Sequence, residues 1–232
     1  MNELKRIKRI LRNKTVAYID YFRFLNKDQQ KVFCIGQNKT GTTSLKDALK
    51  DFGYKFGHQG RAALLIDAWH QRDFKKIMKY CQTAEAFQDI PFSMAYTYQH
   101  MDLAFKNAKF ILTERDDAEQ WYQALTKFHT KIFGDGTHIP TEADLKNQPF
   151  LYKGFAYKYI NYAFNAPADD PYNKPILMAN YINYNNAVKD YFRSRPEKLL
   201  VINVSKPSDY DNLCLFLNQP NTKKRFPWRN KT

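Results

Sequence analysis

A run of small and hydroxyl-bearing residues between positions 36 and 44 could hold an anion. Gly36 and Gly41 bracket Lys39, which brings a positive charge into the loop. The same stretch carries hydroxyl groups on Thr40, Thr42, Thr43 and Ser44. An apolar run precedes the loop and a helical pattern follows it, so backbone N–H groups and the positive end of a helix dipole converge on one point. A phosphate or a similar anion is the ligand expected there.

The position of the lysine distinguishes this loop from the phosphate-binding loop of nucleotide triphosphatases. In nucleotide triphosphatases the lysine follows the second glycine and precedes a Ser or Thr that binds magnesium. Here Thr42 occupies that position, and the lysine stands before the second glycine as Lys39. No apolar strand ends in a convincing acidic pair for magnesium, so no metal is expected. An ATP-dependent kinase remains an alternative, and so does a Ser/Thr-rich turn that merely caps a helix.

Two more polar positions follow predicted strands. Asp89 lies at the end of the run 84–90, just before Pro91, and Arg115 follows the run 109–113. The carboxyl ends of parallel strands share one edge of a sheet, so both residues should lie near the loop. Asp89 could instead bind nearby backbone in a turn. Arg115 could instead form an ion pair with Glu114 or Asp116 at a helix start.

Short apolar runs alternate with helical patterns along the chain. Strands are predicted over 32–35, 53–57, 84–90, 109–113 and 199–202. Helices are predicted over 45–52, 94–105, 117–133, 180–192 and 210–217, with two more around 64–69 and 74–78. This alternation predicts a three-layer α/β/α domain around a five-stranded parallel sheet. The segment 134–173 is irregular and rich in aromatic residues, which favours a substrate-binding insertion.

Composition limits the class of protein. The chain has 232 residues, a formal net charge of +14 and three cysteines without metal-ligand spacing. Buried reduced thiols and a cytoplasmic location are expected, because there is no disulfide framework, signal peptide or membrane span. No nucleic-acid-binding module is recognisable, so the charge favours a small anionic ligand.

The first part of the chain differs from the rest. Residues 1–27 hold eight Lys or Arg against two acidic residues, with apolar residues at helical spacing. We expect residues 1–30 to form a basic helical extension and residues 31–232 to form a single domain. The extension could contact an anionic membrane surface, or it could pack on the domain with its basic face in water. The oligomeric state is left open.

Several motifs together carry a family resemblance. They are VFCIGQNKTGTTSL, GYKFGHQG, AFQDIPF, KFILTERDDAEQWYQAL, YFRSRPEKLLVIN, LCLFLNQP and FPWRNK. Their order and separations resemble the P-loop-containing sulfotransferases that use 3′-phosphoadenosine 5′-phosphosulfate (PAPS), over nearly the whole chain after residue 31. The resemblance implies transfer of a sulfuryl group to an acceptor hydroxyl, with 3′-phosphoadenosine 5′-phosphate (PAP) as product.

The resemblance also implies roles for the donor-binding residues. The loop from Lys39 to Ser44 would hold the 5′-phosphosulfate, with Lys39 neutralising charge on the leaving phosphate. Arg115 matches the arginine that grips the 3′-phosphate, a role suited to its planar fork of donors. Relatives place a serine about two turns further on, where this chain has Gln123 and Ala124, and Gln123 could replace it. The basic stretch 223–225 could also contribute.

The acceptor side is less defined. Asp89 occupies the position where relatives place a histidine base, and a carboxylate there could take the proton of the attacking hydroxyl. His58 follows a predicted strand and could face the acceptor or act as the base, whereas His100 lies in mid-helix and is expected to be structural. The acceptor could be a small molecule or a glycan, including an aromatic or lipid alcohol. A non-catalytic nucleotide-binding or membrane-surface protein is a third interpretation.

Overall fold

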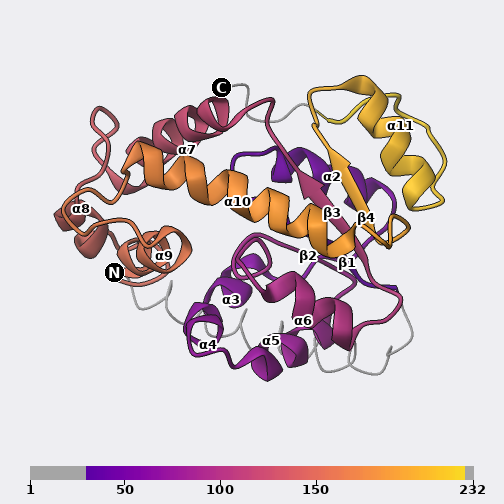
Figure 1. The fold of residues 1–232 in the computed structure, drawn as a ribbon, viewed down its shortest axis with the longest axis horizontal. Helices are drawn as coiled ribbons and strands as arrows, with labels where there is room; N and C mark the ends of the chain where they lie inside the picture. Colours follow the sequence, from indigo (N-terminus) through magenta and orange to yellow (C-terminus); the bar gives the residue numbers. More distant parts are fainter. Residues whose placement is uncertain (1–29, 228–232) are drawn as a thin grey trace, which may run out of the picture.

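The fold is built on a short parallel sheet. The computed structural model describes residues 30–227 of the chain. Its strands are β1 (Val32–Cys34), β2 (Ala86–Gln88), β3 (Lys109–Thr113) and β4 (Leu199–Ile202). They are all parallel, in the order β2-β1-β3-β4 (Figure 1). The carboxyl ends of β2, β1 and β3 are therefore neighbours, as the sequence predicts for the segments that carry Asp89, the loop and Arg115.

The sheet has four strands within the described residues, so the prediction of five is wrong. The segment 53–57 reaches the edge of β2 but pairs only through an isolated bridge between Phe56 and Ala86. Gly53 leaves α2 (Thr42–Asp51) with a φ of 90°, and the chain enters the next helix at position 59. Too few residues lie between these helices to extend along β2.

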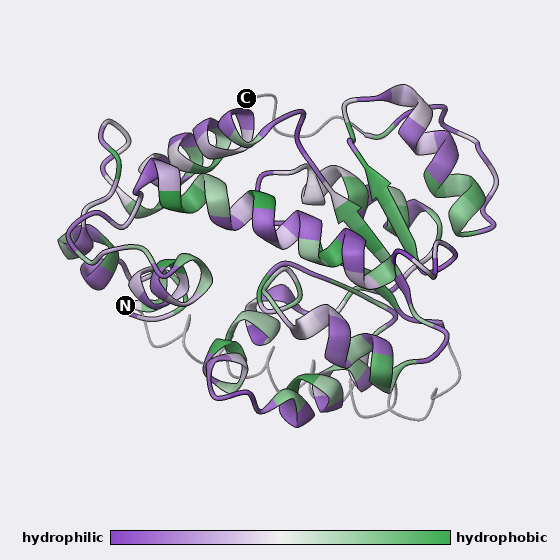
Figure 2. Cartoon of the chain, in the orientation of Figure 1, coloured by the Kyte–Doolittle hydropathy of each residue, from purple (hydrophilic) through white to green (hydrophobic). Residues whose placement is uncertain are grey.

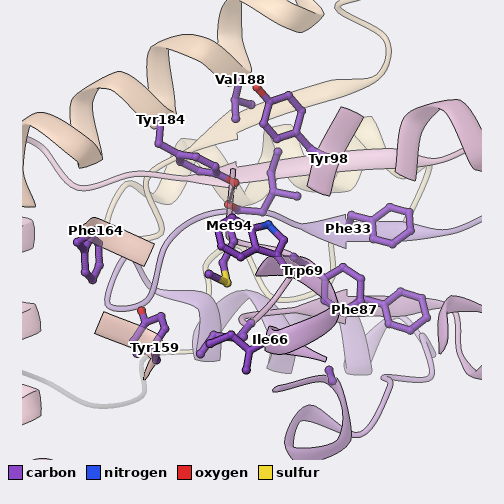
Figure 3. Packing of buried hydrophobic residues seen from close by; sticks show 14 of the residues in the cluster. Phe33, Ile66, Trp69, Phe87, Met94, Tyr98, Tyr159, Phe164, Tyr184 and Val188 are labelled. Carbon is purple, nitrogen blue, oxygen red and sulfur yellow. Dashed lines mark hydrogen bonds between the residues drawn. The ribbon is translucent and has the colours of Figure 1, made fainter. Parts of the chain in front are cut away.

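Strand residues alternate between two separate apolar layers, as expected for a sheet covered on both faces. Phe33 and Phe110 face a cluster that includes residues of α6 (Thr97–Ala104) and α10 (Lys174–Phe192). Val32 and Ile111 face the opposite cluster, built from α2 and α11 (Pro207–Phe216). Figure 2 shows the apolar strands between helices of mixed polarity, and Figure 3 shows the packing of the larger cluster. The three-layer α/β/α arrangement is thus present.

The remaining helices are short except for one. They are α3 (Gln59–Ala63), α4 (Ile66–His70), α5 (Phe74–Tyr80), α7 (Ala118–Phe133), α8 (Glu142–Asn147) and α9 (Phe155–Phe164), with a 3₁₀ turn at Cys81–Thr83. The segment 134–173 is therefore more regular than predicted, because it contains α8 and α9. Helix α10 begins six residues before the predicted position 180, since the Asn173 side chain accepts a hydrogen bond from the Ile176 N–H (3.2 Å) and caps it.

The three cysteines are buried, as expected. The predicted basic extension over residues 1–30 lies almost entirely outside the described residues. Among residues 30–227, no helix combines the length and the apolar character that crossing a bilayer requires.

Candidate functional site

Two glycines shape the loop between β1 and α2. An added Cβ on Gly36 would lie 2.0 Å from the Thr113 Oγ1 atom of β3, so a side chain does not fit there. Gly41 adopts a φ of 99° and occupies the N-cap position of α2. Within the described residues, no side chain caps this helix, so its first N–H groups point outward without a side-chain acceptor. Such an N-terminus is suited to bind an anion.

Aromatic side chains of α7 and α10 hold the loop in place. The Tyr184 hydroxyl donates to the carbonyl of Ile35 at 2.7 Å, and the Trp121 indole N–H donates to the carbonyl of Asn38 at 3.0 Å. Tyr181 stacks on Trp121 with ring centroids 4.5 Å apart. Its hydroxyl accepts the backbone N–H of Arg115 at 2.9 Å. Two helices far apart in sequence thus fix the ends of β1 and β3 together.

The structure brings Lys39 and Arg115 together. The Arg115 Nε–H donates to the carbonyl of Lys39 at 2.6 Å, and the Lys39 ammonium lies 4.1 Å from the centre of the Phe128 ring. Burial lowers the pKa of Lys39, and the positive charges of Arg115 and Lys131 lower it further. Burial also lowers the pKa of Arg115. Two half-buried cations next to an uncapped helix N-terminus form a site for a multiply charged anion.

The acidic neighbours of Arg115 are engaged elsewhere. Glu114 pairs with Lys189 at 2.8 Å, and Asp116 accepts a hydrogen bond from Asn203 at 2.8 Å. Within residues 30–227 Arg115 forms no ion pair, so the alternative of a pair with Glu114 or Asp116 does not describe this structure. Apart from the Nε–H that binds the Lys39 carbonyl, the guanidinium group retains its donors for a ligand.

A cavity of about 300 Å³ joins the loop to Asp89 and Arg115. Its polar lining comprises Asn38, Lys39, Thr42, Thr43, Ser44, Asp89, Arg115, His129 and Tyr159, beside Gly41. Its apolar lining comprises Ile90, Phe128, Ile132, Phe133, Phe150 and Phe155. Lys39, Asp89 and Arg115 follow the ends of three strands, as expected, whereas His129 and Tyr159 belong to α7 and α9. Three side chains of the aromatic segment 134–173, on Phe150, Phe155 and Tyr159, complete the wall.

Asp89 presents one carboxylate oxygen without a partner. Its Oδ2 accepts hydrogen bonds from the side-chain amides of Gln88 (3.1 Å) and Gln59, whereas its enclosed Oδ1 has no partner among the described residues. Burial raises the pKa of Asp89, although the hydrogen bonds from Gln88 and Gln59, the charge of Lys46 and an interaction with the Thr42 hydroxyl act in the opposite direction. Asp89 therefore has the features of a proton acceptor whose orientation is fixed by its neighbours.

Sequence reasoning missed Gln59 and Lys46, which lie near Asp89, and His129, which lies on the cavity wall. The Gln59 side chain donates to Asp89 and accepts from the Lys46 ammonium. His129 is buried, and its Nδ1 lies 2.9 Å from the Tyr172 hydroxyl. Burial and the charge of Lys39 lower the pKa of His129 to about 3, so its ring is neutral. Only His129 gave a signal, because it lies four residues after Leu125 and four before Phe133, on the apolar face of α7.

Some predicted site residues lie elsewhere. The Thr40 hydroxyl donates to the Gln37 carbonyl at 2.6 Å and lies against Thr113, inside the loop and away from the cavity. His58 caps α3 by accepting the Arg61 N–H. His100 stacks on Phe74 with ring centroids 3.8 Å apart, in keeping with its expected structural role.

Gln123 lines one further groove, and Lys223 and Arg225 of the basic stretch near the end of the chain line another. Gln123 donates to Glu119 at 2.7 Å and lines a groove of about 700 Å³ that also contains Arg115. Lys223 pairs with Asp51 at 2.5 Å and lines a different groove with Arg225. Arg115 therefore borders both the central cavity and the groove of Gln123.

The fold and the cavity define an α/β protein with an anion site at the carboxyl edge of a parallel sheet. A sulfotransferase-domain family model matches residues 31–232. The chain therefore belongs to the sulfotransferase-domain family, which confirms the resemblance and supports a transferase of sulfuryl groups. The comparison with curated proteins found no match.

Proposed function

We propose that the protein transfers a sulfuryl group from PAPS to a hydroxyl of a small acceptor. The observation that carries this proposal is that Lys39, Asp89 and Arg115, from three different strand ends, line one cavity. The family supports the reaction class, and the shared cavity supports the choice of these residues. The proposal treats PAPS as a co-substrate and assigns no metal.

The residues present fit a donor with several negative charges. The first turn of α2 offers N–H groups that no side chain caps in the described part of the chain, and Lys39 stands at its entrance. Arg115 adds a guanidinium without an acidic partner among residues 30–227. Thr42, Thr43 and Ser44 would add hydroxyl or N–H donors to the 5′ end of the donor. Arg115, with Gln123 beside it, would hold the 3′-phosphate.

Sulfuryl transfer requires the protein mainly to position the two reactants and to neutralise the charge that develops. Asp89 would accept the acceptor's proton on its free Oδ1 while the acceptor oxygen bonds to sulfur. Lys39 would offset the negative charge that develops on the phosphate oxygen as its bond to sulfur breaks. Gln59 and Gln88 would keep the second oxygen of Asp89 occupied and so direct Oδ1 to the acceptor.

Calorimetric titration with PAP tests the donor site directly. We expect metal-independent binding to the parent protein and weaker binding of ATP with magnesium. Substituting Arg115→Ala should weaken PAP binding about 10- to 100-fold, since hydrogen bonds to charged groups contribute about 1.5–3 kcal/mol. Arg193→Ala is the matched control, because Arg193 is exposed and pairs with Asp190 away from the cavity.

The outcomes separate the alternatives. Binding of ATP with magnesium but not of PAP would overturn the proposal in favour of a kinase. Equal PAP binding by the Arg115 and Arg193 variants would remove Arg115 from the donor site. PAP binding without sulfuryl transfer to any acceptor would favour the non-catalytic protein.

A further inference from the structure

Lys46 and Gln59 lie beside Asp89 but not on the wall of the central cavity. Lys46 is a half-buried residue of α2, one helical turn after Thr42 of the anion loop. Its ammonium donates to the Oε1 atom of Gln59 and lies 5.7 Å from the centre of the Phe56 ring. A half-buried cation thus contacts a neutral amide, and that amide in turn binds Asp89.

These contacts form a chain of hydrogen bonds that can run in one direction only. A lysine ammonium can only donate, so Lys46 requires the amide oxygen of Gln59 on its side. The amide nitrogen of Gln59 is then turned to Asp89 and donates to its Oδ2. Gln88 donates to the same oxygen at 3.1 Å. Both lone pairs of Oδ2 are therefore occupied. The oxygen left for a proton is Oδ1, which has no partner among the described residues.

The charges around Asp89 act in the same sense. Burial raises the pKa of Asp89, and the charge of Lys46 is among the influences that lower it. The Cys34 thiol and the Tyr159 hydroxyl also face the carboxylate, but burial raises the pKa of both, so they are neutral. The other titratable side chains on the cavity wall, unchanged in the variants below, are Lys39, Arg115 and His129.

We propose that Lys46 is a positioning residue that acts on Asp89 through Gln59. It holds the Gln59 amide in one orientation, which occupies Oδ2 and leaves Oδ1 to receive the proton of the acceptor hydroxyl. Its charge also favours the ionised carboxylate, which is the form that can accept a proton. The role in sulfuryl transfer rests on the proposed function, whereas the effect on the ionisation of Asp89 does not.

The ionisation of Asp89 can be followed in the full-length protein without donor or acceptor. The probe is the carboxyl ¹³C NMR signal of aspartate-labelled protein that disappears in Asp89→Asn. In Lys46→Met the titration midpoint of this signal should rise by about one pH unit, because a nearby opposite charge is lost. Lys46→Arg keeps both a donor and a charge and should restore most of the shift.

Two further variants define the route of the effect. Lys50→Met is the matched control, because it removes the same charge from the next turn of α2, where Lys50 is exposed. It should leave the Asp89 midpoint nearly unchanged. Burial and the charge of Lys50 lower the pKa of Lys46, whereas Asp89 and Asp47 raise it, so Lys46 stays charged in this control. In a Gln59→Met background, Lys46→Met should shift the midpoint less than in the parent, since contacting residues are not additive.

Three results would overturn the inference: an unchanged midpoint in Lys46→Met, an equal rise in Lys50→Met, or an equal effect of Lys46→Met with and without Gln59. In sulfate transfer from PAPS, the acid limb of the kcat/KM profile should move with the Asp89 midpoint. Transfer whose acid limb stays in place would remove Lys46 from the reaction. Absence of PAP binding would overturn the proposed function alone, because the NMR midpoints are measured without PAP.

Discussion

Asp89 combines a free carboxylate oxygen with a pKa that burial raises above the usual aspartate range. The fold therefore disfavours its ionised form. For an acid with a raised pKa, the native state binds the extra proton at low pH, and this stabilisation is lost as the pH rises through the folded pKa. The ionised Asp89 that the proposed reaction needs would thus be held at the expense of stability.

Asp89→Asn should separate these two effects. The variant cannot ionise, so we expect it to melt at a higher temperature than the parent at pH 8, with a smaller difference at pH 4. Turnover should fall by at least about 100-fold, because a positioned base contributes roughly 10²–10⁴, while PAP binding is retained. Thermal melts at both pH values and sulfate transfer assays check this. Asp169→Asn, on an exposed loop, is the control. Retained turnover would exclude Asp89 as the base.

The pKa shift of His129 makes stability depend on pH in the direction opposite to that of Asp89. Burial and Lys39 lower its pKa to about 3 from an ordinary 6.5. The unfolded chain therefore binds a proton between these values that the native state does not, and stability falls on acidification below about pH 6.5. Its share between pH 7.5 and pH 5 is about 2 kcal/mol, from roughly 1.4 kcal/mol per pKa unit.

His129→Gln should remove this pH sensitivity. We expect the variant to lose about 2 kcal/mol less than the parent when urea unfolding is compared at pH 7.5 and pH 5. The absolute stability of the variant matters less than this difference, since glutamine also changes the contact with Tyr172. An identical pH dependence in both proteins would show that His129 is protonated in the folded state.

At the scale of elements, Asp102 joins α6 to the end of α10 and the start of β4. Its side chain is 2% exposed and contacts Arg195 at 2.5 Å and Lys198 at 2.6 Å. The Tyr191 hydroxyl donates to it at 3.0 Å. Burial alone would raise the pKa of Asp102, but the hydrogen bonds from Lys198, Arg195 and Tyr191 lower it overall. One buried carboxylate of α6 thus binds three side chains from the end of α10 and from the residues between α10 and β4.

Asp102→Ala should destabilise the protein by about 3–5 kcal/mol, because it leaves partly buried charges without their partner. Urea unfolding measures the change. The matched control is Asp190→Ala, whose pair with Arg193 is exposed on both sides and should change stability by less than about 1 kcal/mol. A similar small change for Asp102→Ala would mean that water replaces its contacts.

The same elements show what periodicity can and cannot predict. β1, β3 and β4 were predictable because a short apolar run between polar residues seldom forms anything other than a buried strand. The helix α9 was missed because aromatic residues occur on all its sides, which hides the helical period. In the site, the loop, Asp89 and Arg115 were found because strand ends mark one edge. Gln59 was not, since its role depends on a contact between segments 30 residues apart.

At the scale of the whole molecule, the net charge of +14 should assist the binding of an anionic donor. We expect the Kd for PAP to rise about five- to tenfold between 50 and 500 mM NaCl. The added salt shortens the Debye length and so screens the attraction between the cationic protein and the anionic ligand. Salt-independent PAP binding would show that local hydrogen bonds dominate over long-range charge.

The connection between α7 and α10 supplies Phe150, Phe155 and Tyr159 to the cavity but no strand to the sheet. The anion loop and Arg115 come from β1 and β3, outside this connection. Under the proposed function, this contiguous stretch would shape the acceptor side of the cavity together with the end of α7, and other stretches would bind the donor. Descendants could acquire new acceptors by exchanging that stretch, provided that buried residues such as Ile160 remain apolar. Diversification of substrates and retention of the reaction are therefore separable in this architecture.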